Sequence, residues 1–62
     1  MKNNILKLRK DKGFTQDNLA KKCNVTRQTI NAIENNKYDP TLQLAFKIAK
    51  VLSVKVDDVF KP

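Results

Sequence analysis

Histidine and tryptophan are absent from this 62-residue chain, and cysteine and glycine each occur once. Without histidine, and with Cys23 as the only cysteine, the chain lacks the ligands of a structural zinc site. A lone cysteine also excludes an internal disulfide and is typical of a reducing compartment such as the cytoplasm. We therefore expect a cytoplasmic protein that holds no metal and no other cofactor.

The same absences weigh against catalysis and against membrane insertion. One cysteine, no histidine and six scattered acidic residues offer no evident pair of nucleophile and base, so we expect no enzyme and no small-molecule ligand. The first ten residues, M-K-N-N-I-L-K-L-R-K, interrupt their apolar positions with lysine. They predict neither a signal peptide nor a membrane span.

Positive charge is what the chain has in excess. Thirteen Lys and Arg against six Asp and Glu give a net charge of +7. This balance favours nucleic acid or an acidic membrane surface as partner, although lysines that merely keep a domain dispersed give the same value. The length predicts a single domain over residues 1–62. A chain this short buries only about 60% of its unfolded surface, so its stability depends on efficient helix packing, a partner, or both.

The apolar residues recur at helical spacing, and no segment alternates as a half-buried strand does. Breaks at Gly13, Asn24 and Asn35–Pro40, with a weaker one at Ser53, predict an all-α bundle of five helices. The expected helices run over about residues 4–12, from the cap Thr15 to Asn24, from the cap Thr26 to Asn35, onward from Pro40 or Thr41, and over about 56–60.

One face of each expected helix supplies the core. Cys23 fits as a small core residue, with a reactive thiol as the less favoured interpretation. Asn24 is expected in a left-handed conformation, which asparagine tolerates well. The remaining inward positions are Ile5, Leu8, Leu19, Ala20, Val25, Ile30, Ile33, Leu42, Ala45, Ile48, Ala49, Leu52, Val56, Val59 and Phe60.

The segment Thr15–Glu34 has a helix-turn-helix pattern: two short amphipathic helices separated by a tight break. The outward face of the second helix carries side chains of the types that hydrogen-bond to base edges and phosphates. In a basic chain this pattern predicts binding to duplex DNA, although such side chains are elsewhere often only solvated. The residues concerned are Arg27, Gln28, Asn31 and Asn35.

Three stretches, L-R-K-D-K-G-F-T-Q-D-N-L-A, V-T-R-Q-T-I-N-A-I-E-N-N and Y-D-P-T-L-Q-L-A-F-K-I-A, resemble in register the phage repressor and Cro-type helix-turn-helix family. The resemblance covers nearly the whole chain and implies a compact five-helix bundle of the lambda-repressor-like type, with the third helix in the major groove. It implies DNA base contacts by Arg27, Gln28 and Ala32, to which the helical wheel adds Asn31. The expected phosphate contacts are Gln16, Thr26, Asn35, Lys37 and Tyr38.

The resemblance also implies structural roles. Arg9 and Glu34 match positions that the family pairs in a partly buried salt bridge between the first and third helices. Asn24, Asn36 and Ser53 stand where the family usually has glycine, and Lys55 stands at a usual serine cap. We therefore expect the last helix to fray unless another segment packs on it.

These features favour a small transcriptional regulator, more specifically a repressor that binds a palindromic operator as a homodimer. A two-fold dimer places two recognition helices about 34 Å apart, one turn of duplex. We expect pairing through the last two helices, with Leu44, Val59 and Phe60 as contacts and Leu6 as a rival contact.

Two other functions remain open. An antitoxin-like protein-interaction module shares this fold, but only Lys61 and Pro62 follow Phe60 to cover a toxin. A protein that coats DNA without sequence preference fits the charge and leaves the outward Gln and Asn unexplained. The abundance of Lys, Asn and Ile indicates an A·T-rich bacterial or phage genome.

Overall fold

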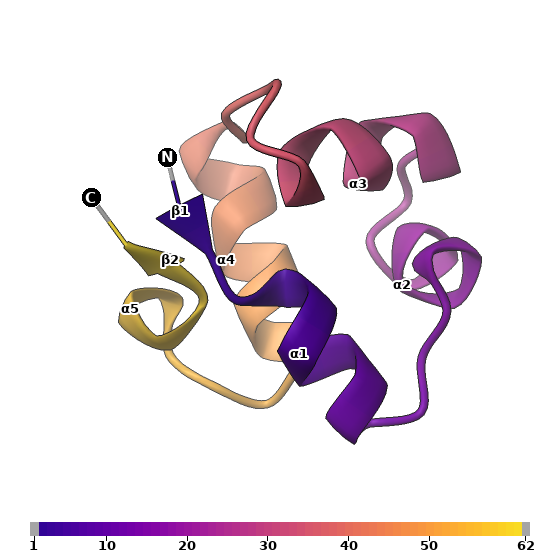
Figure 1. The fold of residues 1–62 in the computed structure, drawn as a ribbon, viewed down its shortest axis with the longest axis horizontal. Helices are drawn as coiled ribbons and strands as arrows, with labels where there is room; N and C mark the ends of the chain where they lie inside the picture. Colours follow the sequence, from indigo (N-terminus) through magenta and orange to yellow (C-terminus); the bar gives the residue numbers. More distant parts are fainter. Residues whose placement is uncertain (1, 62) are drawn as a thin grey trace.

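The computed structural model describes residues 2–61, and Met1 and Pro62 lie outside the described residues. The expected five helices are present in this range, accompanied by two very short strands (Figure 1). None of these helices is long and apolar enough to cross a bilayer within the described range. The elements are β1 (Lys2–Asn3), α1 (Ile5–Asp11), α2 (Gln16–Lys22), α3 (Arg27–Glu34), α4 (Leu42–Val51), α5 (Val56–Val59) and β2 (Phe60–Lys61).

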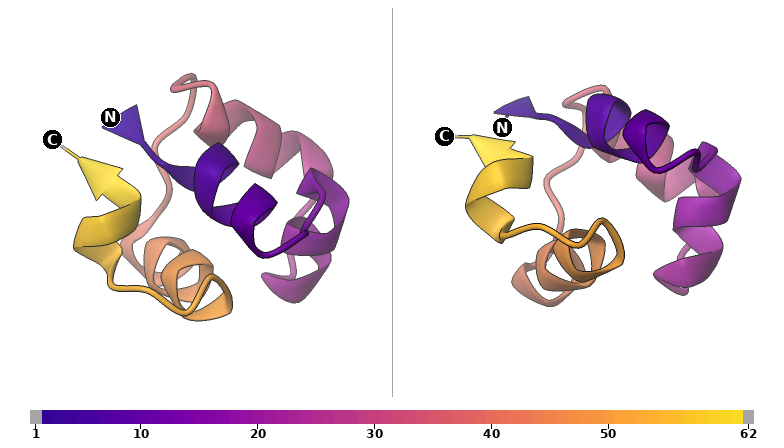
Figure 2. Two further views of the ribbon diagram at one scale, coloured as in Figure 1. Left: turned by 60° about the horizontal axis from the view of Figure 1, so that its bottom comes forward. Right: turned by 90° about the horizontal axis from the view of Figure 1, so that it is seen from below.

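The helices enclose a single hydrophobic core to which each of them contributes. Both views of Figure 2 place α2 and α5 at opposite ends of the molecule. Each fully buried Ile or Leu contributes roughly 1.5–3 kcal/mol, so most of the stability of this small chain comes from these positions. The largest residues that expose less than 2% of their surface are Ile5, Leu19, Cys23, Ile30, Ile33, Ile48, Leu52 and Val59.

Threonine caps begin three of the helices. The hydroxyl of Thr15 accepts from the backbone N–H of Asn18 at 3.0 Å, and the Asn18 side chain accepts from the Thr15 N–H at 3.1 Å. Thr26 and Thr41 cap α3 and α4 in the same way, each with its hydroxyl 3.2 Å from the N–H three residues on. Each cap stabilises its helix by about 1 kcal/mol, and the first two fix where the helix-turn-helix elements begin.

Left-handed residues end the helices or follow them directly. The prediction for Asn24 is confirmed, since its φ is 60°. Asn36 and Ser53 have φ angles of 61° and 60°, as glycine would have at these positions, and the one glycine, Gly13, has φ 76°. Asparagine tolerates this conformation better than serine does, so Ser53 carries the largest conformational cost of the three.

The two strands were not expected from the sequence. β1 and β2 pair antiparallel, with Lys2 opposite Lys61 and Asn3 opposite Phe60, and this brings the two ends of the described chain side by side (Figure 1). The backbone N–H of Asn4 also donates to the Val59 carbonyl at 2.7 Å. Strands of two residues are too short to show an alternating pattern, which explains why they were missed.

The N-terminal segment therefore packs on the last helix and holds it in place. The Asn4 side chain donates to the Asp58 carbonyl at 3.2 Å. At the other end of α5, the Asp58 carboxylate accepts from the backbone N–H of Lys55 at 3.1 Å, which is the half of a capping box that needs no serine at position 55. These contacts supply the support that the last helix was expected to need.

Leu42 is a correction to the predicted core. It was assigned to the inner stripe of α4, but 71% of its surface is exposed. At about 100° per residue, Leu42 lies roughly 70–90° from the centre of the stripe formed by Ala45, Ile48 and Leu52. It also opens the helix, where no neighbouring element covers it. Phe46, one turn further along, is 57% exposed.

The expected dimer contacts need a second correction. Val59 has no exposed surface and Phe60 exposes only 8%, because both side chains fill the core of their own chain. A side chain that is already buried has almost no apolar area left to remove from water on pairing. Leu44 is half-buried and packs against the same core. None of these three residues therefore offers a large exposed apolar surface, whereas Leu6, Leu42 and Phe46 do.

Candidate nucleic-acid interface

The outward face of α3 presents three polar side chains around one shallow hollow. Arg27, Gln28 and Asn31 line this hollow of about 300 Å³, and all three are exposed. Ile30 and Ile33, on the opposite face, are buried. The helix therefore has one apolar face that fixes it to α2 and the core, and one polar face that is free to meet a partner.

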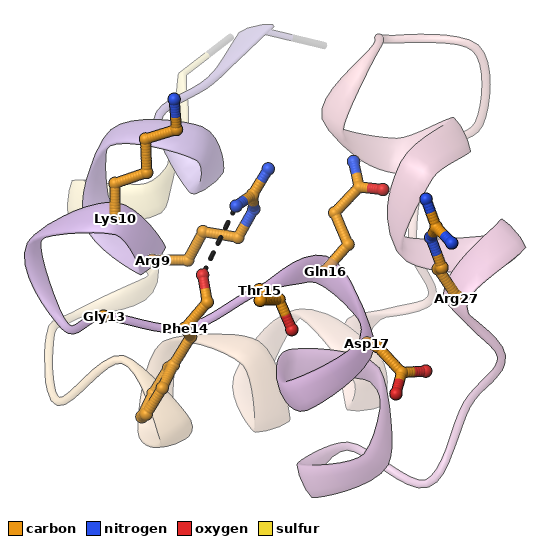
Figure 3. A pocket seen from close by; sticks show the side chains of 8 residues that line it. All are labelled: Arg9, Lys10, Gly13, Phe14, Thr15, Gln16, Asp17 and Arg27. Atoms are coloured by element: carbon orange, nitrogen blue, oxygen red, sulfur yellow. Dashed lines mark hydrogen bonds between the residues drawn. The ribbon is translucent and has the colours of Figure 1, made fainter.

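A larger hollow of about 600 Å³ lies between the end of α1 and the start of α2 (Figure 3). The side chains of Lys10, Gln16 and Arg27 project to the same side of it, and the Asp17 carboxylate turns away from them. Asp17 pairs instead with Lys21, at 3.3 Å between Oδ2 and Nζ. The positive charges of Lys10 and Arg27 and the amide of Gln16 thus lie around one hollow next to the outward face of α3, which is an arrangement suited to an anion.

Side-chain amides connect α2 to the outer face of α3. Asn31 Nδ2 donates to Gln16 Oε1 at 3.3 Å. Asn35 Nδ2 donates to the Asn31 carbonyl at 2.9 Å and to Asn31 Oδ1 at 3.3 Å. The structure therefore brings together one expected base contact, Asn31, and two expected phosphate contacts, Gln16 and Asn35.

The other expected contact residues are distributed around α3. Thr26 is exposed at its start, where its hydroxyl is occupied by capping. Ala32 is half-buried. Lys37 and Tyr38 lie in the loop that follows, and Lys37 is fixed there because its backbone N–H donates to the Ala32 carbonyl at 2.8 Å. Tyr38 exposes 49% of its surface.

Arg9 and Glu34 form the ion pair that the sequence analysis expected. Arg9 Nε and Nη2 each donate to a different oxygen of Glu34 at 2.9 Å, and the side chains are only 12% and 8% exposed. Arg9 Nη1 also donates to the Phe14 carbonyl at 3.3 Å (Figure 3). These hydrogen bonds to Glu34 raise the pKa of Arg9 above its ordinary value. The pair ties α1 to the end of α3.

Asn3 is a residue whose role the sequence analysis missed. Its Nδ2 donates to the Ile33 carbonyl at 2.9 Å and to Asn36 Oδ1 at 3.1 Å, while its Oδ1 accepts from the Ile5 N–H at 3.1 Å. The side chain therefore begins α1 and caps the end of α3 at the same time. An asparagine two residues before a helix indicates the first role. Nothing in the sequence indicates the second.

Cys23 lies in the core with 1% of its surface exposed. Burial raises the pKa of the Cys23 thiol, and the positive charge of Lys47 partly offsets that rise. The thiol is thus held neutral and shielded, as a packing residue is. Among the described residues, no three His, Cys, Asp or Glu side chains gather as metal ligands would.

Comparison with known proteins agrees with this geometry. A capped pair of short helices with a polar second face defines a helix-turn-helix DNA-binding domain of the lambda-repressor-like type. The helix-turn-helix family profile matches residues 5–59, so the chain belongs to this family, that of Cro/C1-type transcriptional regulators. The members of the family are DNA-binding regulators and not enzymes.

Similar proteins are known from archaea and bacteria. An uncharacterized HTH-type transcriptional regulator of Methanocaldococcus jannaschii is 57% identical over 60 residues, which cover 97% of this chain and 91% of the relative. The uncharacterized HTH-type transcriptional regulator YgzD of Bacillus subtilis is 48% identical with the same coverage. The crystal structure of NHTF, a hypothetical transcription factor from Neisseria, aligns with a TM-score of 0.84 at 29% identity. That alignment covers 89% of this chain and 62% of the Neisseria chain.

Proposed function

We propose that this protein is a repressor that binds a palindromic operator in duplex DNA as a homodimer, with α3 in the major groove. The observation that carries the proposal is the exposed group of Arg27, Gln28 and Asn31 on one face of α3, with Lys10 and Gln16 grouped beside it. Repression follows when the occupied operator overlaps a promoter.

Base recognition in this proposal rests on the first turn of α3. A guanidinium donates two parallel hydrogen bonds to O6 and N7 of guanine, so Arg27 is assigned to a guanine. A carboxamide both donates to N7 and accepts from N6 of adenine, so Gln28 is assigned to an adenine. Ala32, half-buried on the same helix, offers a methyl group to a thymine methyl.

Phosphate contacts supply the orientation and the salt-sensitive part of the affinity. We assign them to Lys10 and Gln16 at the larger hollow, and to Lys37 and Tyr38 in the loop after α3. Thr26, exposed at the start of α3, is assigned a further phosphate contact. The net charge of +7 brings the protein to DNA before any specific contact forms.

The homodimer is proposed to form through the outer surface of α4 and the segment that leads into α5. Leu42 and Phe46 are exposed one helical turn apart. Beside Phe46 lies a hollow of about 570 Å³ that is mostly apolar, with Lys50 and Asp57 among its lining residues. In a two-fold pair the same surface meets itself, so a lysine and an aspartate on it can face each other across the axis.

Selection of binding sites from a random duplex library, with excess non-specific competitor at about 0.15 M salt, tests the proposal. Recovery of a palindrome with half-sites one helical turn apart supports a dimeric, sequence-specific regulator. A reporter gene placed behind the recovered operator then tests repression. If no sequence is enriched, base recognition by Arg27 and Gln28 fails, and an antitoxin-like interaction module becomes the better hypothesis.

A further inference from the structure

The side-chain amides on the outer face of α3 are linked to one another and to α2 by hydrogen bonds. We infer that Asn31 is a positioning residue, which directs the carboxamide of Gln16 toward a DNA phosphate instead of reading a base. The inference rests on the proposed function and deepens it, because it assigns a different role to one of the residues expected to read bases. The chain of hydrogen bonds runs from Asn35 through Asn31 to Gln16.

The direction of this chain is set at one end by a backbone carbonyl. The Asn31 carbonyl can only accept, so the Asn35 group that lies 2.9 Å from it must be the nitrogen. That nitrogen also lies 3.3 Å from the Asn31 side chain, which must therefore turn its oxygen toward Asn35. The Asn31 nitrogen then faces Gln16 and donates to Oε1 at 3.3 Å. Each amide in turn fixes the orientation of the next.

The far end of the chain is the Gln16 nitrogen. Because the oxygen of Gln16 is held by Asn31, its NH₂ group points away from that bond, as donors must to hold an anion. Figure 3 shows the Gln16 oxygen turned toward α3 and the Gln16 nitrogen turned upward, the direction in which the side chain of Lys10 also extends. A reversed carboxamide would present its oxygen there and repel a phosphate. Asn31 thus selects the orientation of Gln16 that binds.

The two internal hydrogen bonds of the Asn31 side chain restrict base reading, because they fix the direction of its amide although one lone pair and one N–H remain open. Recognition of adenine by an amide needs both its oxygen and one N–H. The Asn31 oxygen already accepts from Asn35, and one of its two N–H groups donates to Gln16. Gln28, by contrast, makes no side-chain hydrogen bond within residues 2–61 and keeps its full capacity for a base.

A double-mutant cycle in DNA binding tests the inference. Gln16→Ala should weaken binding about tenfold, the loss expected for a hydrogen bond to a charged group. Asn31→Ala should weaken binding by no more than that and equally for every duplex tested, and the double variant should bind as Gln16→Ala does. The matched control is Gln28→Ala, which should change the preferred base pair and add independently to Gln16→Ala.

A second readout needs no DNA. In a ¹⁵N–¹H NMR spectrum of the free protein, the side-chain NH₂ signals of Gln16 are identified by their loss in Gln16→Ala. They should shift in Asn31→Ala and stay in place in Gln28→Ala. Asn31 and Gln28 are both exposed, so neither substitution should unfold the chain. The backbone signals of each variant check this.

The outcomes separate the inference from the function on which it rests. If the wild-type protein selects a sequence but Asn31→Ala changes the preferred base and adds fully to Gln16→Ala, Asn31 reads a base and the inference is overturned. Unshifted Gln16 signals in Asn31→Ala overturn it as well. If the wild-type protein binds no duplex at all, the proposed function fails, and the assigned phosphate contact fails with it.

Discussion

Glu34 holds a carboxylate that is 8% exposed and accepts from Arg9 through both of its oxygens. Glu34→Ala leaves the Arg9 guanidinium buried without its counter-charge, which costs on the order of 3 kcal/mol of unfolding free energy. Thermal or urea melting of the variant measures this loss. Because the pair joins α1 to the end of α3, the fold should weaken as a unit and not only at the DNA-binding face.

The exposed pair Asp17–Lys21 provides the matched control for that experiment. Its side chains are 53% and 76% exposed, and they lie four residues apart on α2. Asp17→Ala should cost less than about 0.5 kcal/mol, since water screens such a pair. If Glu34→Ala lost no more unfolding free energy than Asp17→Ala, the Arg9 guanidinium would have to be solvated in the variant. That result would contradict the 12% exposure of the Arg9 side chain.

A substitution of Arg27 tests base recognition most directly. Arg27→Ala is expected to cost about 1–3 kcal/mol at one base pair of each half-site and to relax the preference there. Competition between the selected operator and single-base variants measures the change. A loss of the same size on every duplex, together with a shallower salt dependence, would make Arg27 a phosphate contact.

Among the connections between helices, the turn after α4 offers a stabilising substitution. Ser53 has a φ of 60°, and its N–H and that of Val54 close the helix by donating to Lys50 and Ala49 at 3.1 and 3.0 Å. Glycine adopts this conformation without the strain of a Cβ, so Ser53→Gly should raise the unfolding free energy by about 1 kcal/mol. Melting measures the gain.

Asn24→Gly is the comparison for Ser53→Gly. Asn24 has the same φ of 60° but belongs to the residue type that tolerates the left-handed region best. The gain there should be smaller, because glycine also increases the freedom of the unfolded chain. Equal gains in unfolding free energy at both positions would show that Ser53 carries no more conformational strain than Asn24.

The helices themselves could be predicted because their signals are local. Caps such as Thr15 and Thr26, and stops such as Asn24, act within four residues of the chain. Apolar spacing then placed Ile30 and Ile33 inward, as the structure has them. The pairing of β1 with β2 joins residues near opposite ends of the chain, and no local pattern records it.

The site was predictable in its residue types and less so in its contacts. Exposure of Arg27 and Gln28 follows from the helical wheel, and the position of Arg9 opposite Glu34 followed from family resemblance. The bond between Gln16 and Asn31 could not be foreseen, because it depends on how two helices cross. For the same reason, Asn3 gave no sign that it caps α3.

The exposed polar and the exposed apolar surfaces lie on different parts of the molecule, as the proposed homodimer requires. The polar face of α3 and the hollow beside α2 carry the exposed cations and amides. The exposed apolar surface on α4 and the segment before α5 involves different residues. A single recognition helix buries too little surface for tight specific binding, so in the proposed homodimer the second surface brings another recognition helix to the DNA.

Phe46→Lys tests this division of the surface, because it removes an exposed aromatic side chain and places a positive charge in the apolar part of the proposed two-fold contact. We expect the variant to be monomeric by analytical ultracentrifugation and to bind a single half-site as the wild-type protein does. Its folded chain should be as stable as that of the wild-type monomer, because Phe46 is not part of the core. Its affinity for the full palindrome should fall by about tenfold or more, since the linkage between two half-sites is lost. Leu6→Lys, at the rival contact on α1 with 45% exposure, is the control and should leave pairing intact. If Leu6→Lys alone gives monomers, the dimer forms through α1, and the apolar surface of α4 must serve another partner.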